Sequence, residues 1–133
     1  LASQAKGVDA IDPVEAAEAG AIELARTHSM VVVITGETDF VTDGSRIARV
    51  SGGSPMMPYI TAMGCSLTCL MGGFAAIAPP LEAAATALEL FAEAGSMAAM
   101  EAKGPGTFQS LFLDALHNIT PMMLAKSERV AWQ

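Results

Sequence analysis

The residues best suited to chemistry lie in the middle of the chain, where residues 59–65 (YITAMGC) lead from a β-like stretch into an apolar helix. The first turn of a helix has backbone N–H groups without partners inside the helix, and the helix dipole is positive there. Anions, and phosphates above all, bind well at such a position. We therefore predict an anion-binding site at the start of this helix, with the thiol of Cys65 at its mouth.

A second segment, residues 31–44 (VVVITGETDFVTDG), predicts a buried strand that leads into a β-hairpin. Its apolar, β-branched start is typical of a strand covered on both faces, and Asp43-Gly44 supplies a tight turn. Glu37, Asp39 and Asp43 allow two interpretations. They could form a metal-binding cluster, but a solvated acidic rim on the hairpin is more common and is favoured here.

Several helices and strands are needed to position these two segments. We expect helices at 14–27, 64–76, 81–102 and 106–118, a further helix or frayed tail at 120–128, a buried strand at 30–35, a hairpin at 40–50 and one more strand near 57–60. Asp12-Pro13 is a good start signal for the first helix. A buried parallel strand needs neighbours on both sides, which so few strands do not readily provide. The sequence therefore predicts an α/β fold that is the C-terminal portion of a larger, mostly parallel sheet.

The composition limits the classes of partner. The chain has 133 residues, enough for one domain, of which 52% are hydrophobic and 16% charged. Its net charge of −7 argues against nucleic-acid and membrane-surface partners, which need clustered Lys and Arg. Residues 62–78 carry no charge and approach the length of a membrane span. Gly72-Gly73 and Pro79-Pro80 interrupt that stretch, so a buried helix is favoured.

Cysteine usage indicates the compartment. Cys65 and Cys69 are the only cysteines, and at four residues apart on one helix they share a face but are poorly placed for a disulfide. The first residues lack both a basic and an apolar leader segment. We therefore expect a reduced, cytoplasmic protein, in which Cys69 packs in the core.

The two segments resemble the second half of hydroxyethylthiazole kinases, which have a ribokinase-like fold. The strongest marks are residues 32–44 (VVITGETDFVTDG) and the helix start at 64–67 (GCSL), and the resemblance extends from residues 7–9 to residues 104–116. It implies a layered αβα architecture with a β-hairpin and several helices. Residues 1–133 would form the C-terminal, ATP-side half of a single domain, whose N-terminal half is absent from this chain.

The resemblance also implies an activity, the ATP- and Mg²⁺-dependent phosphorylation of the primary alcohol of 4-methyl-5-(2-hydroxyethyl)thiazole in thiamine salvage. Cys65 would be the catalytic residue and would orient the acceptor hydroxyl more than deprotonate it, while Thr35 and Gly36 would contact ATP. The turn that acts as the anion hole would consist of Ala62, Met63, Gly64 and Cys65.

The resemblance further implies what this chain lacks and how it assembles. Ala62 lies at a position associated with the thiazole substrate, where the family usually has Gly, and Met63 stands where the family usually has Thr. The acidic residues that organise Mg²⁺ and a phosphate-contacting Arg precede this segment in the family, so we expect no metal ligand in this chain. The family forms homotrimers with the substrate site at a subunit interface.

Two alternatives remain beside the thiazole kinase. One is a ribokinase-like kinase for another vitamin precursor, such as a hydroxymethylpyrimidine or pyridoxal; such relatives usually have Asp at the position of Cys65, which argues against them. The other is a non-catalytic fragment that binds nucleotide or packs on a partner chain, for which the altered pair Ala62-Met63 is an argument.

Overall fold

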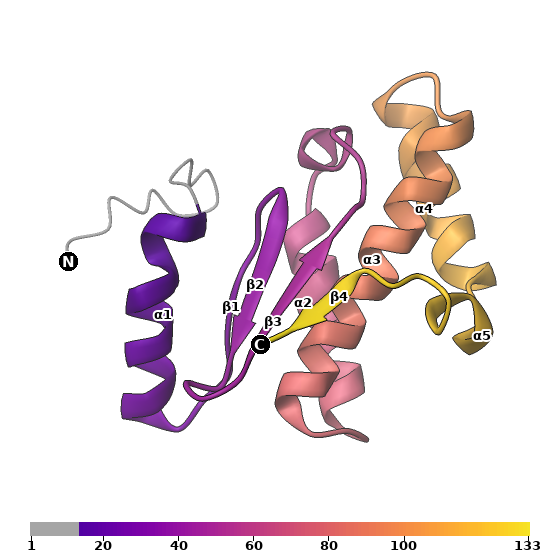
Figure 1. Cartoon of the computed structure of the whole chain (residues 1–133). Coiled ribbons are helices and arrows are strands. Elements are labelled where there is room, and N and C mark those ends of the chain that lie inside the picture. The colour runs from indigo at the N-terminus through magenta and orange to yellow at the C-terminus, as the bar shows by residue number, and fades with distance from the viewer. Residues whose placement is uncertain (1–13) are drawn as a thin grey trace.

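The computed structural model describes residues 14–133 of the chain (Figure 1). Its elements follow in the order α1 (Val14–His28), β1 (Val32–Ile34), β2 (Thr38–Thr42), β3 (Ile47–Ser51), the 3₁₀ helix η2 (Met57–Tyr59), α2 (Met63–Ala75), α3 (Pro80–Glu101), α4 (Pro105–Asn118), α5 (Pro121–Leu124) and β4 (Val130–Trp132). The four long helices begin and end within about one residue of their predicted bounds. Asp12-Pro13, the predicted start signal of α1, lies outside the described residues.

The sheet has four strands in the order β1-β2-β3-β4, and every pair among them is antiparallel. The prediction of a mostly parallel sheet is therefore wrong for the strands that this structure describes. Only residues 35–37 join β1 to β2 and only residues 43–46 join β2 to β3. A parallel pair needs a crossover of roughly a dozen residues or more, whereas such short connections permit hairpins alone. Within residues 14–133, β1 lies at the edge of the sheet and is half-buried, whereas its sequence predicted a strand covered on both faces.

Helices cover both faces of the sheet, which confirms the α/β class (Figure 1). Successive side chains of a strand point to opposite faces. Val41 and its cross-strand partner Ala48 therefore share one face and join the core that α3 covers. Phe40 and its partner Arg49 share the other face, where the Arg49 guanidinium lies 5.2 Å from the centre of the Phe40 ring and pairs with Glu18 of α1.

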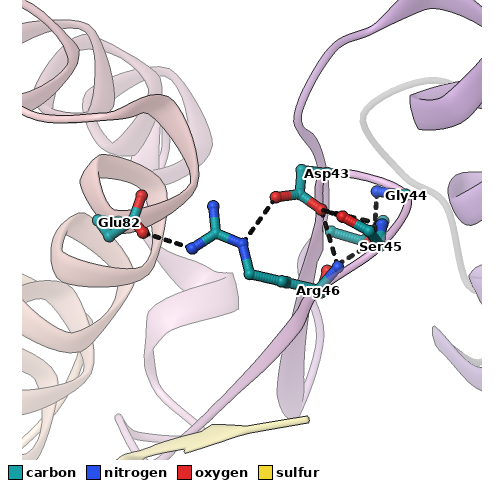
Figure 2. Close-up of polar contacts among 6 residues, drawn as sticks. Asp43, Gly44, Ser45, Arg46 and Glu82 are labelled. Carbon is teal, nitrogen blue, oxygen red and sulfur yellow. Dashed lines mark hydrogen bonds and ion pairs between the residues drawn. The ribbon is translucent and has the colours of Figure 1, made fainter.

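The hairpin turn between β2 and β3 forms as predicted, because its side chains satisfy the backbone of the turn. One carboxylate oxygen of Asp43 accepts hydrogen bonds from the backbone N–H of Ser45 (2.9 Å), the backbone N–H of Arg46 (2.8 Å) and the hydroxyl of Ser45 (2.8 Å) (Figure 2). Gly44 has a φ of 91°, a left-handed conformation that few other residues adopt without strain. The pKa of the Asp43 carboxyl lies well below its usual range, chiefly because the two backbone N–H groups stabilise its charge.

Arg46 connects this turn to the first turn of α3. Its guanidinium donates to Asp43 (3.0 Å) and to Glu82 (2.7 Å), so that the cation lies between two carboxylates (Figure 2). The hydrogen bond from Arg46 lowers the pKa of Glu82. The side chains of Arg46 and Glu82 are 54% and 39% exposed, so solvent screening keeps the net stabilisation small. The bridge therefore fixes the position of the turn more than it stabilises the fold.

Two further elements differ from their predictions. The strand expected near 57–60 is the 3₁₀ helix η2, in which Pro58 has no N–H to donate to a strand partner. The end of the chain adds β4, which pairs with β3, after the short helix α5; neither the strand nor its pairing was predicted. Within residues 14–133, no helix is both long and apolar enough to cross a membrane.

Replacing Asp43 with Ala should lower the free energy of unfolding by about 2 kcal/mol, because the turn loses the acceptor of several hydrogen bonds. Urea unfolding measures this difference. The loss should shrink as the pH falls below about 4, since a carboxylate with a lowered pKa stabilises the folded state only where it is ionised.

Asp114→Ala is the matched control, because Asp114 is exposed on α4 and its side chain makes no hydrogen bond among the described residues. We expect it to change the free energy of unfolding by less than about 0.5 kcal/mol. Equal effects of the two substitutions would show that the turn does not depend on Asp43.

Candidate functional site

The start of α2 has the geometry of an anion-binding site. Its first internal hydrogen bond runs from the N–H of Ser66 to the carbonyl oxygen of Ala62 (2.9 Å). The N–H groups of Met63, Gly64 and Cys65 therefore have no backbone partner within the described part of the chain, as expected for a first helical turn. No acidic residue lies in this turn, and no side chain caps it. Three free donors and the positive end of the helix dipole thus face the same direction.

Ala62, the residue that precedes α2, has a left-handed backbone with a φ of 64°. Only glycine adopts this conformation without a steric penalty, which for other residues is roughly 1–2 kcal/mol. This explains in physical terms why a glycine suits the position better than the alanine that this chain has. The left-handed turn sends the chain sharply into α2 and so sets the direction of the free N–H groups.

Cys65 is exposed at the first turn of α2, where a bound molecule can reach its thiol. Cys69 is exposed too, so the prediction that Cys69 packs in the core is wrong within this structure. Leu67 is the buried residue of α2. The side of α2 that carries Leu67 packs against the core around α3. Cys65 and Cys69 lie two positions before and after Leu67, so on a helix of 3.6 residues per turn they point away from that core.

Thr35 and Gly36 form part of the connection between β1 and β2, and both are exposed. The N–H of Gly36 donates to the carboxylate Oδ1 of Asp39 at 2.9 Å, which closes the turn across four residues. Sequence reasoning did not find this role of Asp39, since its place near Glu37 in an acidic stretch suggested a solvated rim. Asp39 is half-buried, and burial raises the pKa of its carboxyl to about 6, against the lowering effect of the Gly36 N–H.

The sheet brings the two predicted segments to the same end of the molecule. Thr38, the first residue of β2, pairs with Ser51, the last residue of β3. The turn at 35–37 and the connection from β3 to α2 therefore leave the sheet side by side. Figure 1 shows this end at the top, with η2 above the sheet and α2 running down from it. Thr35 and Gly36 on one side and Cys65 on the other are all exposed, and no hydrogen bond joins Thr35 to Cys65 in the described residues.

Tight packing against α3 fixes the connection between β3 and α2. Gly53 has a φ of 86° and lies against Gly95 of α3, where an added Cβ would come within 3.2 Å of the Gly53 Cα atom. The hydroxyl of Ser96 donates to the carbonyl oxygen of Gly53 at 3.2 Å, and Arg129 donates to that hydroxyl at 3.1 Å. The sequence does not predict the role of Gly95, because the close approach of Gly53 that requires a glycine there depends on the tertiary structure.

The acidic residues of the hairpin do not gather. Asp39 lies near the β1–β2 turn, whereas Asp43 lies at the opposite end of β2. Among residues 14–133, no group of three or more His, Cys, Asp or Glu is placed to hold a metal ion. Two shallow hollows lie away from this helix start, one between α3, α5 and β4 and the other beside the end of α1. The start of α2 is thus a surface site.

Comparison with known proteins gives a consistent relationship. A family model described as the hydroxyethylthiazole kinase family matches residues 1–122. The hydroxyethylthiazole kinase of Gemmatimonas aurantiaca is 60% identical over 128 residues, which cover 96% of this chain and 46% of that protein. The hydroxyethylthiazole kinase of Rhizobium rhizogenes is 51% identical over 130 residues, covering 96% of this chain and 48% of that protein. The chain spans about half the length of the curated relatives it matches.

A solved structure supports the same relationship. The hydroxyethylthiazole kinase protein from Pyrococcus horikoshii OT3 superposes with a TM-score of 0.84 at 33% sequence identity, and the match covers 90% of this chain and 47% of that chain. The predicted ribokinase-like α/β fold is thereby confirmed.

Ala62→Gly should raise the free energy of unfolding by about 1 kcal/mol, because glycine removes the steric penalty of the left-handed backbone. Thermal or urea unfolding measures the change. The matched control is Ala19→Gly, at an exposed interior position of α1, which should lower stability by about 1 kcal/mol. Destabilisation by both substitutions would contradict a strained Ala62.

Asp39→Asn should become more stable relative to the unchanged protein as the pH rises from about 4 to about 7. A carboxyl whose pKa is raised to about 6 in the folded state contributes stability at low pH, and this contribution is lost as the pH rises through 6. Asparagine has no charge to bury at any pH. Urea unfolding at several pH values measures the difference; a difference that does not vary with pH would refute the assignment.

Proposed function

The chain belongs to the hydroxyethylthiazole kinase family, and from this premise we propose that it forms the nucleotide-side half of a thiazole kinase. The reaction transfers the γ-phosphate of ATP to the primary alcohol of 4-methyl-5-(2-hydroxyethyl)thiazole. One observation carries the proposal: the free N–H groups of Met63, Gly64 and Cys65 lie at the surface beside the exposed Cys65 thiol. The chain that places them there is 60% identical to a hydroxyethylthiazole kinase.

Phosphoryl transfer depends mainly on positioning and on stabilisation of negative charge, because the protein makes and breaks few bonds itself. The N–H groups at the start of α2 are oriented before the reaction begins, so they stabilise charge on the phosphoryl oxygens without reorganising. The thiol of Cys65 orients the acceptor hydroxyl, and Ala62 borders the thiazole. Thr35 and Gly36 contact ATP from the neighbouring turn, which leaves the same end of the sheet.

Kinases of this kind use Mg²⁺, but the described residues do not fit it. The carboxylates near the site belong to Glu37 and Asp39, and they form no group suited to a metal ion within the described chain. The side chain of Asp39 also accepts a hydrogen bond from Gly36. The metal ligands would come from the half of the relatives that this chain does not span, and no step above depends on them.

A companion half and a homotrimer are further parts of the proposal. α2 contains no charged residue, yet Leu67 is its buried residue and most of the others are exposed or half-buried. A helix of this composition ordinarily lies inside a protein. The other half of the enzyme would cover α2, and association of three copies in the cytoplasm would complete the substrate site.

A non-catalytic nucleotide-binding fragment is the second candidate, since Ala62 has a backbone conformation that favours glycine and the penalty falls at the anion hole itself. A kinase for another vitamin precursor is the third, and Cys65 in place of Asp argues against it. A panel of alcohols tested with the full-length protein decides among them. Phosphorylation of the thiazole alcohol in preference to a hydroxymethylpyrimidine and pyridoxal supports the proposal. Phosphorylation of none of them supports the non-catalytic, nucleotide-binding candidate.

Cys65→Ala in the full-length protein should lower kcat by about 100-fold or more and change the Kd for ATP less than about threefold, because the thiol acts on the acceptor and not on the nucleotide. Steady-state kinetics and calorimetry measure the two quantities. Cys69→Ala is the matched control, since Cys69 is an exposed cysteine one turn along α2. Equal losses of turnover and ATP affinity, or equal effects at both cysteines, would show that Cys65 is structural.

A further inference from the structure

Asp39 stands out because its environment is unfavourable for a carboxylate and yet its geometry is well defined. It is the second residue of β2, opposite Val50 of β3, and it lies on the same face of β2 as the core residue Val41. Its side chain is half-buried, and burial is the main cause of its raised pKa. A polar group in such a position ordinarily has a partner that accounts for it.

That partner is the turn in front of β2. The carboxylate Oδ1 of Asp39 accepts a hydrogen bond of 2.9 Å from the N–H of Gly36. Gly36 would otherwise be the least constrained residue of the turn, since glycine has the widest choice of backbone conformations. The bond ties the turn to a strand held on both sides by β1 and β3.

We propose that Asp39 is the residue that positions the Thr35–Gly36 turn for ATP, a role that rests on the proposed kinase function. Asp39 acts through the backbone of Gly36 and does not itself contact the nucleotide. The hydrogen bond holds the turn in one conformation before ATP arrives, and Thr35, which precedes Gly36 directly, takes its orientation from that conformation. Loss of the bond leaves the turn to be ordered by the ligand, at the expense of affinity.

The side chain of Asp39 affects affinity without determining the fold. Gly36 is exposed, so water replaces the lost acceptor when the carboxylate is removed. Valine cannot accept the hydrogen bond, favours strands and would lie beside the core residues Val41 and Val50, which makes Asp39→Val a substitution that β2 tolerates. Asparagine retains an oxygen in the place of Oδ1 and can accept the same hydrogen bond. The two variants therefore separate the hydrogen bond from the rest of the side chain.

The test uses the full-length protein and compares Asp39→Val, Asp39→Asn and the exposed neighbour Glu37→Gln. We expect Asp39→Val to raise the Kd and KM for ATP about tenfold, with kcat at saturating ATP nearly unchanged and with a midpoint of thermal unfolding that does not fall. Asp39→Asn should stay within about threefold of the unchanged protein, and Glu37→Gln within about twofold. Amide hydrogen exchange at Gly36 should speed up in Asp39→Val alone.

Two results would overturn the inference: an unchanged Kd for ATP in Asp39→Val, or an equal loss in Asp39→Val and Asp39→Asn. The proposed function fails separately. A full-length protein that binds ATP but does not phosphorylate the thiazole alcohol would refute the kinase, while the ATP affinities of the variants would still decide the role of Asp39. Should Asp39→Val not fold, the exchange rate at Gly36 and the Kd for ATP in Asp39→Ala, whose side chain has no acceptor, decide the same question.

Discussion

The packing of α3 is the constraint on which the rest of the structure depends. This helix contacts the sheet, α2 and α4, and its buried residues include Leu81, Leu88 and Phe91 along with many alanines. Alanine favours the helix and lets neighbouring backbones come close, so α3 alone can pack against the sheet, α2 and α4. Phe91 also meets Phe112 of α4 edge to face, with ring centres 4.9 Å apart.

The same helix sets the place of the candidate site, although it contributes no residue to it. Gly95 admits the backbone of Gly53 at close range, and Ser96 binds the Gly53 carbonyl. This contact fixes the path from β3 to η2, and the left-handed Ala62 then turns the chain into α2. The direction of the free N–H groups is therefore determined by packing more than ten residues away in the sequence.

Features with a local cause were predictable from the sequence. Asp43-Gly44 determines a tight turn by its own hydrogen bonds and backbone freedom, and the hairpin formed where those residues predicted it. The long helices followed from their composition, and the helix start at Cys65 from its preceding small residues. In each case the residues that determine the structure lie within a few positions of it.

Features that depend on distant partners were not predictable. An apolar, β-branched segment at 30–35 is compatible with either pairing direction, and the short connection to β2 decided for an antiparallel pair at the sheet edge. The exposure of Cys69 depends on what covers α2, which no nearby residue determines. The acidic stretch favours a solvated rim for Asp39, because the sequence shows its neighbours along the chain and not its bond back to Gly36.

The two elements of the proposed site have different physical needs, and the fold meets them separately. The start of α2 needs free donors, which a helix end provides without any particular side chain, so the donors are in place with Ala62 and Met63 in this turn. The Thr35–Gly36 turn has no such inherent geometry and needs a side chain to hold it. Side-chain identity should therefore matter more in the turn before β2 than in the turn before α2, apart from the Cys65 thiol. Both turns lie at one end of the sheet. The conformation of the Thr35–Gly36 turn should therefore affect the affinity for a nucleotide bound there, and the position of the turn before α2 should affect the rate of phosphoryl transfer.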